Sequence, residues 1–130
     1  MKPEDFAYAV QTGKSVDEAT VSVLKAAEKS GWSIFSIYDV RERLAAKGFQ
    51  QRPLKIVELC SAKYANHFLE RNRLVSLCMP CKINILEEKD GVKIVGMRPS
   101  AVAYFFPEVN EKDAKDAETE LIAIIDQAKE

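Results

Sequence analysis

The chain lacks the features that define several common classes of enzyme and membrane protein. It has one histidine in 130 residues, so a Ser-His-Asp catalytic set is not credible. Its five glycines are scattered, and no glycine-rich phosphate-binding loop occurs among them. No apolar run approaches the roughly 20 residues that a membrane-spanning helix needs. The sequence therefore excludes the simplest hydrolase, nucleotide-binding and integral-membrane interpretations.

An excess of charge of one sign is also missing. The 19 basic and 20 acidic residues leave a formal net charge of -1, which provides no global field for attracting nucleic acid or an anionic membrane. The N-terminus carries Pro3, Glu4 and Asp5 where a secretory signal needs an apolar core. Three cysteines fit reduced thiols better than a disulfide framework. We expect a cytoplasmic protein with no nucleic-acid or membrane partner.

The length and composition fit one ordinary globular domain that covers residues 1–130. The chain has a mass of 14.6 kDa and is 47% hydrophobic and 30% charged, as is typical of a soluble domain. A domain of this size buries about two thirds of its unfolded surface. We find no internal repeat, low-complexity tract or linker that would divide it.

Capping patterns and hydrophobic periodicity predict the first elements. Residues 6–12 are expected to form a strand. Ser15 and Glu18 form a capping-box pattern, in which each side chain accepts from the other residue's backbone amide at the start of a helix. Gly31 offers the left-handed conformation that ends this helix. Residues 32–38 are rich in aromatic and β-branched side chains and are expected to form the next strand.

The middle of the chain repeats this order of strand and helix. Asp39 begins a second capping pattern before a short helix that is expected to end at Gly48. Residues 54–60 then alternate as a strand does, and Ser61 is placed to cap a following helix.

The last part of the chain contains a predicted hairpin and the longest predicted helix. Residues 82–88 and 92–97 are expected to pair across an Asp-Gly turn, whereas residues 100–106 fit either a helical turn or a short strand. Asn110 caps a C-terminal helix whose apolar stripe is Ala114, Ala117, Leu121, Ile124, Ile125 and Ala128. We expect an α+β fold, with helices packed on one face of a largely antiparallel sheet and a long C-terminal helix.

The order of these elements and the segments around the cysteines resemble the family catalogued as domain of unknown function 302. The most specific matches are Ile-Val-Glu-Leu-Cys60-Ser, at the end of a strand, and Leu-Cys-Met-Pro-Cys81, at the start of the hairpin. The resemblance covers nearly the whole chain, with Cys78 and His67 as additions. It implies a fold similar to the TATA-binding-protein-like architecture and a homodimer, but no activity.

Three cysteines provide the only clustered reactive chemistry. Cys60 precedes a predicted helix start, whose amides and dipole can lower the pKa of a thiol, and Cys81 is followed by Lys82. If their strands are neighbours, the two sulfurs form a dithiol, with Cys78 as a resolving or third thiol. The alternative is that they are small buried hydrophobic residues at strand ends. A strand follows Cys81, whereas a thioredoxin-like Cys-x-x-Cys motif opens a helix.

The sequence also contains a set of residues that zinc can use. Cys60, His67, Cys78 and Cys81 supply three thiols and one imidazole. Their spacing matches no common zinc knuckle, and His67 lies off the apolar side of its predicted helix. We therefore expect no cofactor, although a soft metal bound by cysteine or histidine stays open.

Glu58 is unusual because it alternates with Leu54, Ile56 and Cys60 on one face of a predicted strand. A carboxylate that faces a core beside a thiol has a raised pKa and can transfer protons, which makes Glu58 a catalytic candidate with Cys60 and Cys81. The alternative is that this strand lies at the edge of the sheet and that its second face, which carries Glu58, is exposed to water.

Aromatic residues complete the set of candidate site residues. Trp32, Tyr38, Tyr104, Phe105 and Phe106 are expected either to line an apolar groove between the sheet and the C-terminal helix or to form plain core. With Cys60 and Cys81 at its mouth, such a groove favours a homodimeric module that binds a small apolar molecule, a soft metal or a partner protein. The alternatives are thiol-dependent redox or sulfur-transfer activity and metal binding through cysteine and histidine.

Overall fold

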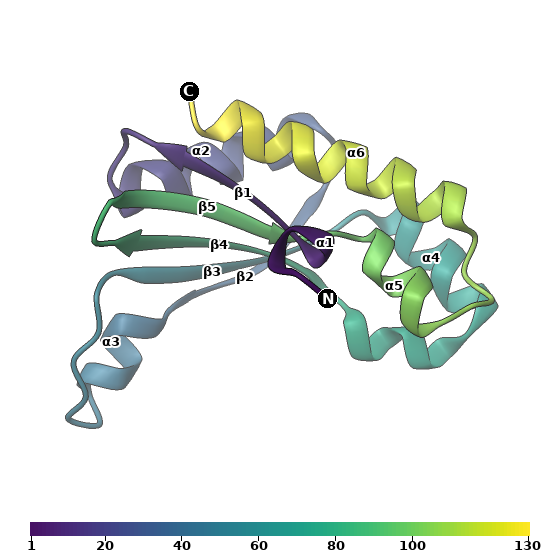
Figure 1. Cartoon of the computed structure of the whole chain (residues 1–130), viewed down its shortest axis with the longest axis horizontal. Helices are drawn as coiled ribbons and strands as arrows, with labels where there is room; N and C mark the ends of the chain where they lie inside the picture. Colours follow the sequence, from purple (N-terminus) through teal and green to yellow (C-terminus); the bar gives the residue numbers. More distant parts are fainter.

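Five strands form one antiparallel sheet in the computed structural model, which describes residues 1–130 (Figure 1). The strand order is β1-β5-β4-β3-β2, and every neighbouring pair is antiparallel. The strands are β1 (Ala7–Thr12), β2 (Ser33–Asp39), β3 (Leu54–Cys60), β4 (Cys81–Glu88) and β5 (Gly91–Met97). The expected α+β class and the antiparallel sheet are confirmed.

Two long helices lie on one face of this sheet, and the other face carries no helix across its middle (Figure 1). The helices are α1 (Pro3–Phe6), α2 (Val16–Lys29), α3 (Val40–Ala45), α4 (Ala62–Arg71), the 3-10 helix η1 (Arg73–Cys78), α5 (Ser100–Phe105) and α6 (Glu111–Ala128). The two on the covered face are α2 and α6, the latter being the expected long C-terminal helix. None of the helices has both the length and the apolar character that crossing a membrane requires.

Local sequence signals account for where the long helices begin. The Ser15 hydroxyl accepts a hydrogen bond from the Glu18 amide at 3.1 Å, and the Glu18 carboxylate accepts one from the Ser15 amide at 3.1 Å. This reciprocal capping box starts α2 as predicted. The Asn110 side chain likewise accepts from the Lys112 amide at 2.8 Å at the start of α6.

Other local predictions need correction. Ser61 occupies the N-cap position of α4, but its side chain accepts no hydrogen bond there. The ambiguous residues 100–106 begin as the helix α5, and the short helix α1 precedes β1 without having been expected. Both helices have only one or two turns, which is too short for hydrophobic periodicity to reveal.

The buried side chains form two clusters that α6 connects. The first, the sheet core, lies between the sheet and the helices α2 and α6, and α6 contributes Leu121, Ile124 and Ile125 to it. The second, the end core, gathers buried residues of α4, η1, the first half of α6 and the segment before it, beyond the end of the sheet, and partly buried residues of α5 pack against it. Its members are Tyr64, Phe68, Val75, Val109, Ala114 and Ala117. The candidate site lies where the two clusters meet.

A glycine on β5 lets α6 pack closely on the sheet. A Cβ atom built at Gly96 would lie 2.8 Å from Ile125 Cδ1 and 3.3 Å from Leu121 Cδ2, both of which belong to fully buried side chains. Close-packed interiors resist added atoms because neighbouring side chains must leave their preferred rotamers.

We therefore expect Gly96→Val to lower the free energy of unfolding by about 1–3 kcal/mol. Gly13→Val is the matched control, because no atom beyond the adjacent residues of the chain lies within 4 Å of the Cβ position at Gly13. Urea denaturation of both variants measures the difference. Equal stability of the two variants would contradict close packing of α6 at Gly96.

Candidate functional site

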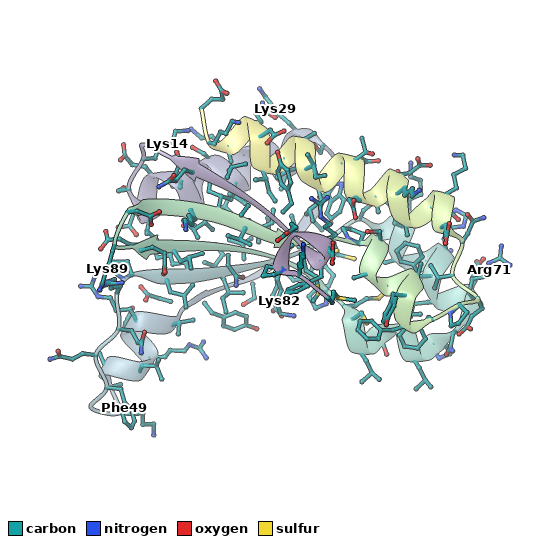
Figure 2. The ribbon with its side chains drawn as sticks, in the orientation of Figure 1. Lys14, Lys29, Phe49, Arg71, Lys82 and Lys89 are labelled. Atoms are coloured by element: carbon teal, nitrogen blue, oxygen red, sulfur yellow. The ribbon has the colours of Figure 1, made fainter.

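The three cysteines meet at the end of the sheet, beside the end core. Leu59 on β3 pairs with Cys81 on β4, so Cys60, the next residue of β3, lies close to Cys81. Cys78 ends η1, and all three free thiols line one cavity of about 30 Å³. In Figure 2 sulfur atoms gather between the strand ends and α5. The strands of Cys60 and Cys81 are therefore neighbours, which was the condition for the two thiols to lie together.

One carboxylate on α6 holds two aromatic walls of this sulfur cavity in place. The indole Nε1 of Trp32 donates a hydrogen bond to Glu120 at 3.0 Å, and the hydroxyl of Tyr64 donates one at 2.6 Å. The bond to Glu120 is the main reason that the pKa of Tyr64 is raised to about 12. Our sequence reasoning missed Glu120, because one glutamate among the charged residues of an amphipathic helix gives no distinguishing signal.

Burial makes two thiols of this cavity, those of Cys60 and Cys81, weaker acids than a free cysteine. It raises the pKa of Cys60, and it is the main cause that raises the pKa of Cys81 to about 11. The neighbouring Cys60 raises the pKa of Cys81 further, and Lys82 lowers it by less. The pKa of Cys60 is therefore raised, whereas the helix start that follows this residue was expected to lower it. Such thiols remain protonated at neutral pH and are poor nucleophiles.

An open groove of about 240 Å³ adjoins the sulfur cavity. The two spaces share the lining residues Cys78, Cys81, Pro99 and Val102. Three large apolar side chains that also line the groove remain largely exposed: Leu77 at 81%, Met97 at 55% and Phe105 at 60%. The strand ends, η1 and α5 thus form an apolar depression with the thiols of Cys78 and Cys81 in its wall.

The predicted aromatic residues do not come together in one groove. Trp32 lines the sulfur cavity and Phe105 lines the adjoining groove. Tyr104 is 70% exposed and lines a separate hollow beside α6, while Phe106 packs against the end core. Tyr38 lies on β2 and donates a hydrogen bond to Glu58 at 2.8 Å. The groove is therefore formed by η1, α5 and strand ends, and not by the sheet and the C-terminal helix as expected.

Glu58 does not face the sheet core. Its strand neighbours Val57 and Leu59 are fully buried in that core, so the alternating Glu58 side chain points to the face without helices. There it lies 4.0 Å from Lys82 Nζ and accepts the bond from Tyr38. The alternative of an edge strand is also wrong, because β3 pairs with both β2 and β4.

The four residues that zinc could use, Cys60, His67, Cys78 and Cys81, do not form one set. His67 is exposed on α4, as its position off the apolar side predicted, and does not line the sulfur cavity. No group of three or more histidine, cysteine, aspartate or glutamate side chains is arranged to hold a metal ion.

A larger hollow of about 480 Å³ lies between α2, α3 and β3, away from the cysteines. It is lined mainly by polar and charged residues, among which Lys55 Nζ and Asp17 Oδ1 pair at 2.9 Å. Because only three of its eleven lining residues are hydrophobic, it offers little surface to an apolar ligand.

The weak acidity of Cys81 predicts slow alkylation. In a Cys60→Ser, Cys78→Ser background, we expect native Cys81 to react with iodoacetamide at pH 8 at least about tenfold more slowly than in urea, because burial, the largest cause of its raised pKa, persists without Cys60. The rate in the native protein should keep rising above pH 9. Intact mass spectrometry measures both rates, and equal rates in the two states would show that the native thiol is not suppressed by burial.

Comparisons with known proteins identify the family. No curated protein matches the chain. A solved structure, the crystal structure of uncharacterized conserved protein DUF302 from Bacillus stearothermophilus, is similar with a TM-score of 0.88 and 26% sequence identity, over 95% of this chain and 98% of that chain. The family model described as Domain of unknown function DUF302 matches residues 8–128. The chain therefore belongs to the DUF302 family, as the resemblance of its cysteine segments indicated.

Proposed function

We propose that this protein is a homodimeric binding module whose groove takes a small, largely apolar molecule. The observation that carries the proposal is the exposure of Leu77, Met97 and Phe105 around one groove of about 240 Å³. Large apolar side chains gathered at a concave surface cost free energy in water, and a ligand that covers them regains it. An apolar cavity of only about 150 Å³ already binds benzene, so the groove has room for a larger molecule.

The properties of the thiols favour binding over reaction. A redox or sulfur-transfer site needs a thiolate, yet burial raises the pKa of Cys60 and raises that of Cys81 to about 11. The zinc alternative needs four ligands, whereas His67 lies apart from the cysteines. Protonated thiols behave instead as small polarizable apolar groups, which suits the wall of an apolar binding site.

Removing one apolar wall of the groove should weaken binding. We expect Phe105→Ala to raise the Kd for 1-decanol about tenfold, because the ligand would no longer bury apolar surface against the phenyl ring. Phe49→Ala is the matched control, since Phe49 is 63% exposed and lies beyond α3, at the opposite end of the molecule (Figure 2). Isothermal titration calorimetry measures both constants.

Either of two results would contradict this groove as the binding site. One is that the wild type does not bind 1-decanol or related neutral apolar molecules at all. The other is that both phenylalanine variants lose affinity equally, which would indicate general surface adsorption.

A second part of the proposal is that two copies associate through the sheet face that no helix covers. A row of paired residues crosses this face through all five strands: Ala9, Val95, Asn84, Ile56 and Tyr38. Ala9, Val95 and Ile56 are aliphatic, and only Tyr38, at one end of the row, is a large side chain with a polar hydroxyl group. An aliphatic stripe across an uncovered sheet is favourable to bury against a second sheet.

Asn84, at the centre of this row, favours a second copy as the occupant. Its side-chain oxygen is buried and has no hydrogen-bond partner within the chain. A carboxamide carries both a donor and an acceptor, so two Asn84 side chains related by a two-fold axis can satisfy each other. An unpaired buried acceptor costs about 1–3 kcal/mol, which such pairing would recover.

A charge at Asn84 should therefore separate the copies. We expect the wild type to have twice the 14.6 kDa mass of one chain in light scattering after gel filtration. Asn84→Asp should shift it towards the monomer, because two carboxylates would face each other across the axis. Gln127→Glu, an exposed position on α6, adds the same charge on the covered side of the sheet and should leave the mass unchanged.

A monomeric wild type would overturn the dimer itself. An Asn84→Asp variant that dimerises with the same dissociation constant as the wild type would show that the copies do not associate through this face.

A further inference from the structure

We infer that the ligand of the groove is an amphipathic carboxylate, with its acid group at Lys82 and its apolar body against η1 and α5. The inference rests on the proposed binding function and names the chemical class of the ligand. Among the eleven residues that line the groove, the only ionisable groups besides the thiols are Lys82 and Arg98, and no acidic side chain lines it. A molecule with one negative group therefore fits better than a cation.

Arg98 is engaged in holding the fold. Its Nη1 lies 3.2 Å from the Glu118 carboxylate and its Nε donates to the Glu4 carbonyl at 3.0 Å. Its guanidinium carbon lies over the Tyr8 ring, 5.5 Å from the centroid, which is a cation–π distance. These contacts join β5 to α1 and α6. Since its charge is already paired with a carboxylate, Arg98 contributes little free positive charge to the groove.

Lys82 is the charged group that remains available. Its Nζ lies 4.0 Å from Glu58 Oε2, which is longer than the roughly 2.7–2.9 Å of a charge-assisted hydrogen bond. Its side chain is 50% exposed, so it can turn to a ligand at the edge of the groove. Glu58 already accepts a hydrogen bond from the Tyr38 hydroxyl, which weakens its attraction for the ammonium group of Lys82. The ammonium group therefore has donors free for a carboxylate.

The geometry separates the polar and apolar halves of such a ligand. Leu77, Met97 and Phe105 offer apolar surface on η1, β5 and α5, while Lys82 sits on β4 at the edge of the same groove. A carboxylate at this edge keeps part of its hydration, which avoids the large cost of burying a charge. An aliphatic or aromatic acid combines these two requirements in one small molecule.

Decanoate and 1-decanol test the inference, because they share one chain and differ in charge. We expect the wild type to bind decanoate about fivefold more tightly than 1-decanol, because one partly exposed ion pair increases affinity by about this factor. Lys82→Gln should remove this preference, and its circular dichroism spectrum verifies that the variant is folded. Lys89→Gln is the matched control, because Lys89 lies at the far end of the β4–β5 hairpin (Figure 2). Calorimetric titration of the three proteins with both ligands at low salt gives the six constants.

Two results overturn the inference in distinguishable ways. Equal affinity of the wild type for decanoate and 1-decanol, or an unchanged preference in Lys82→Gln, would reject the carboxylate and leave an apolar binding site. Failure of both probes to bind would reject the proposed binding function and the inference with it.

Discussion

The hydrogen bonds to Glu120 join the two halves of this molecule. One carboxylate on α6 accepts from Trp32, which belongs to the sheet core, and from Tyr64, which belongs to the end core. Hydrogen bonds to a charged acceptor are about twice as strong as neutral ones. They fix the position of α4 against the start of β2. The sulfur cavity between these elements is small and apolar because its walls are held in this way.

This constraint explains why the thiols are gathered but not activated. The topology brings Cys60, Cys78 and Cys81 to one cavity, as a catalytic dithiol would require. The same cavity excludes the water that would stabilise a thiolate, and this outweighs the effect of Lys82, so the pKa of Cys81 rises to about 11. The adjoining groove, with its exposed apolar rim, is then the part of the region best suited to contact another molecule.

The sequence could predict most of the fold because its signals are local. The capping box at Ser15, the Asp-Gly turn of the hairpin and the apolar stripe of α6 each depend on residues a few positions apart. The site could be predicted only in part. The nearness of Cys60 and Cys81 follows from adjacent strands, but the role of Glu120 and the isolation of Tyr38 from Trp32 depend on how distant elements pack.

The central claim is that a small molecule binds where the groove meets the sulfur cavity, and the three methionine methyl groups report on it directly. Met97 lines the groove, Met79 lines the cavity, and Met1 lies exposed at the N-terminus as an internal reference. We would titrate protein labelled with ¹³C at the methionine methyl groups with decanoate and follow the three resonances. We expect saturable shifts of Met97 and Met79 with Met1 unmoved. Unmoved Met97 and Met79 signals, or equal shifts of all three, would contradict the central claim.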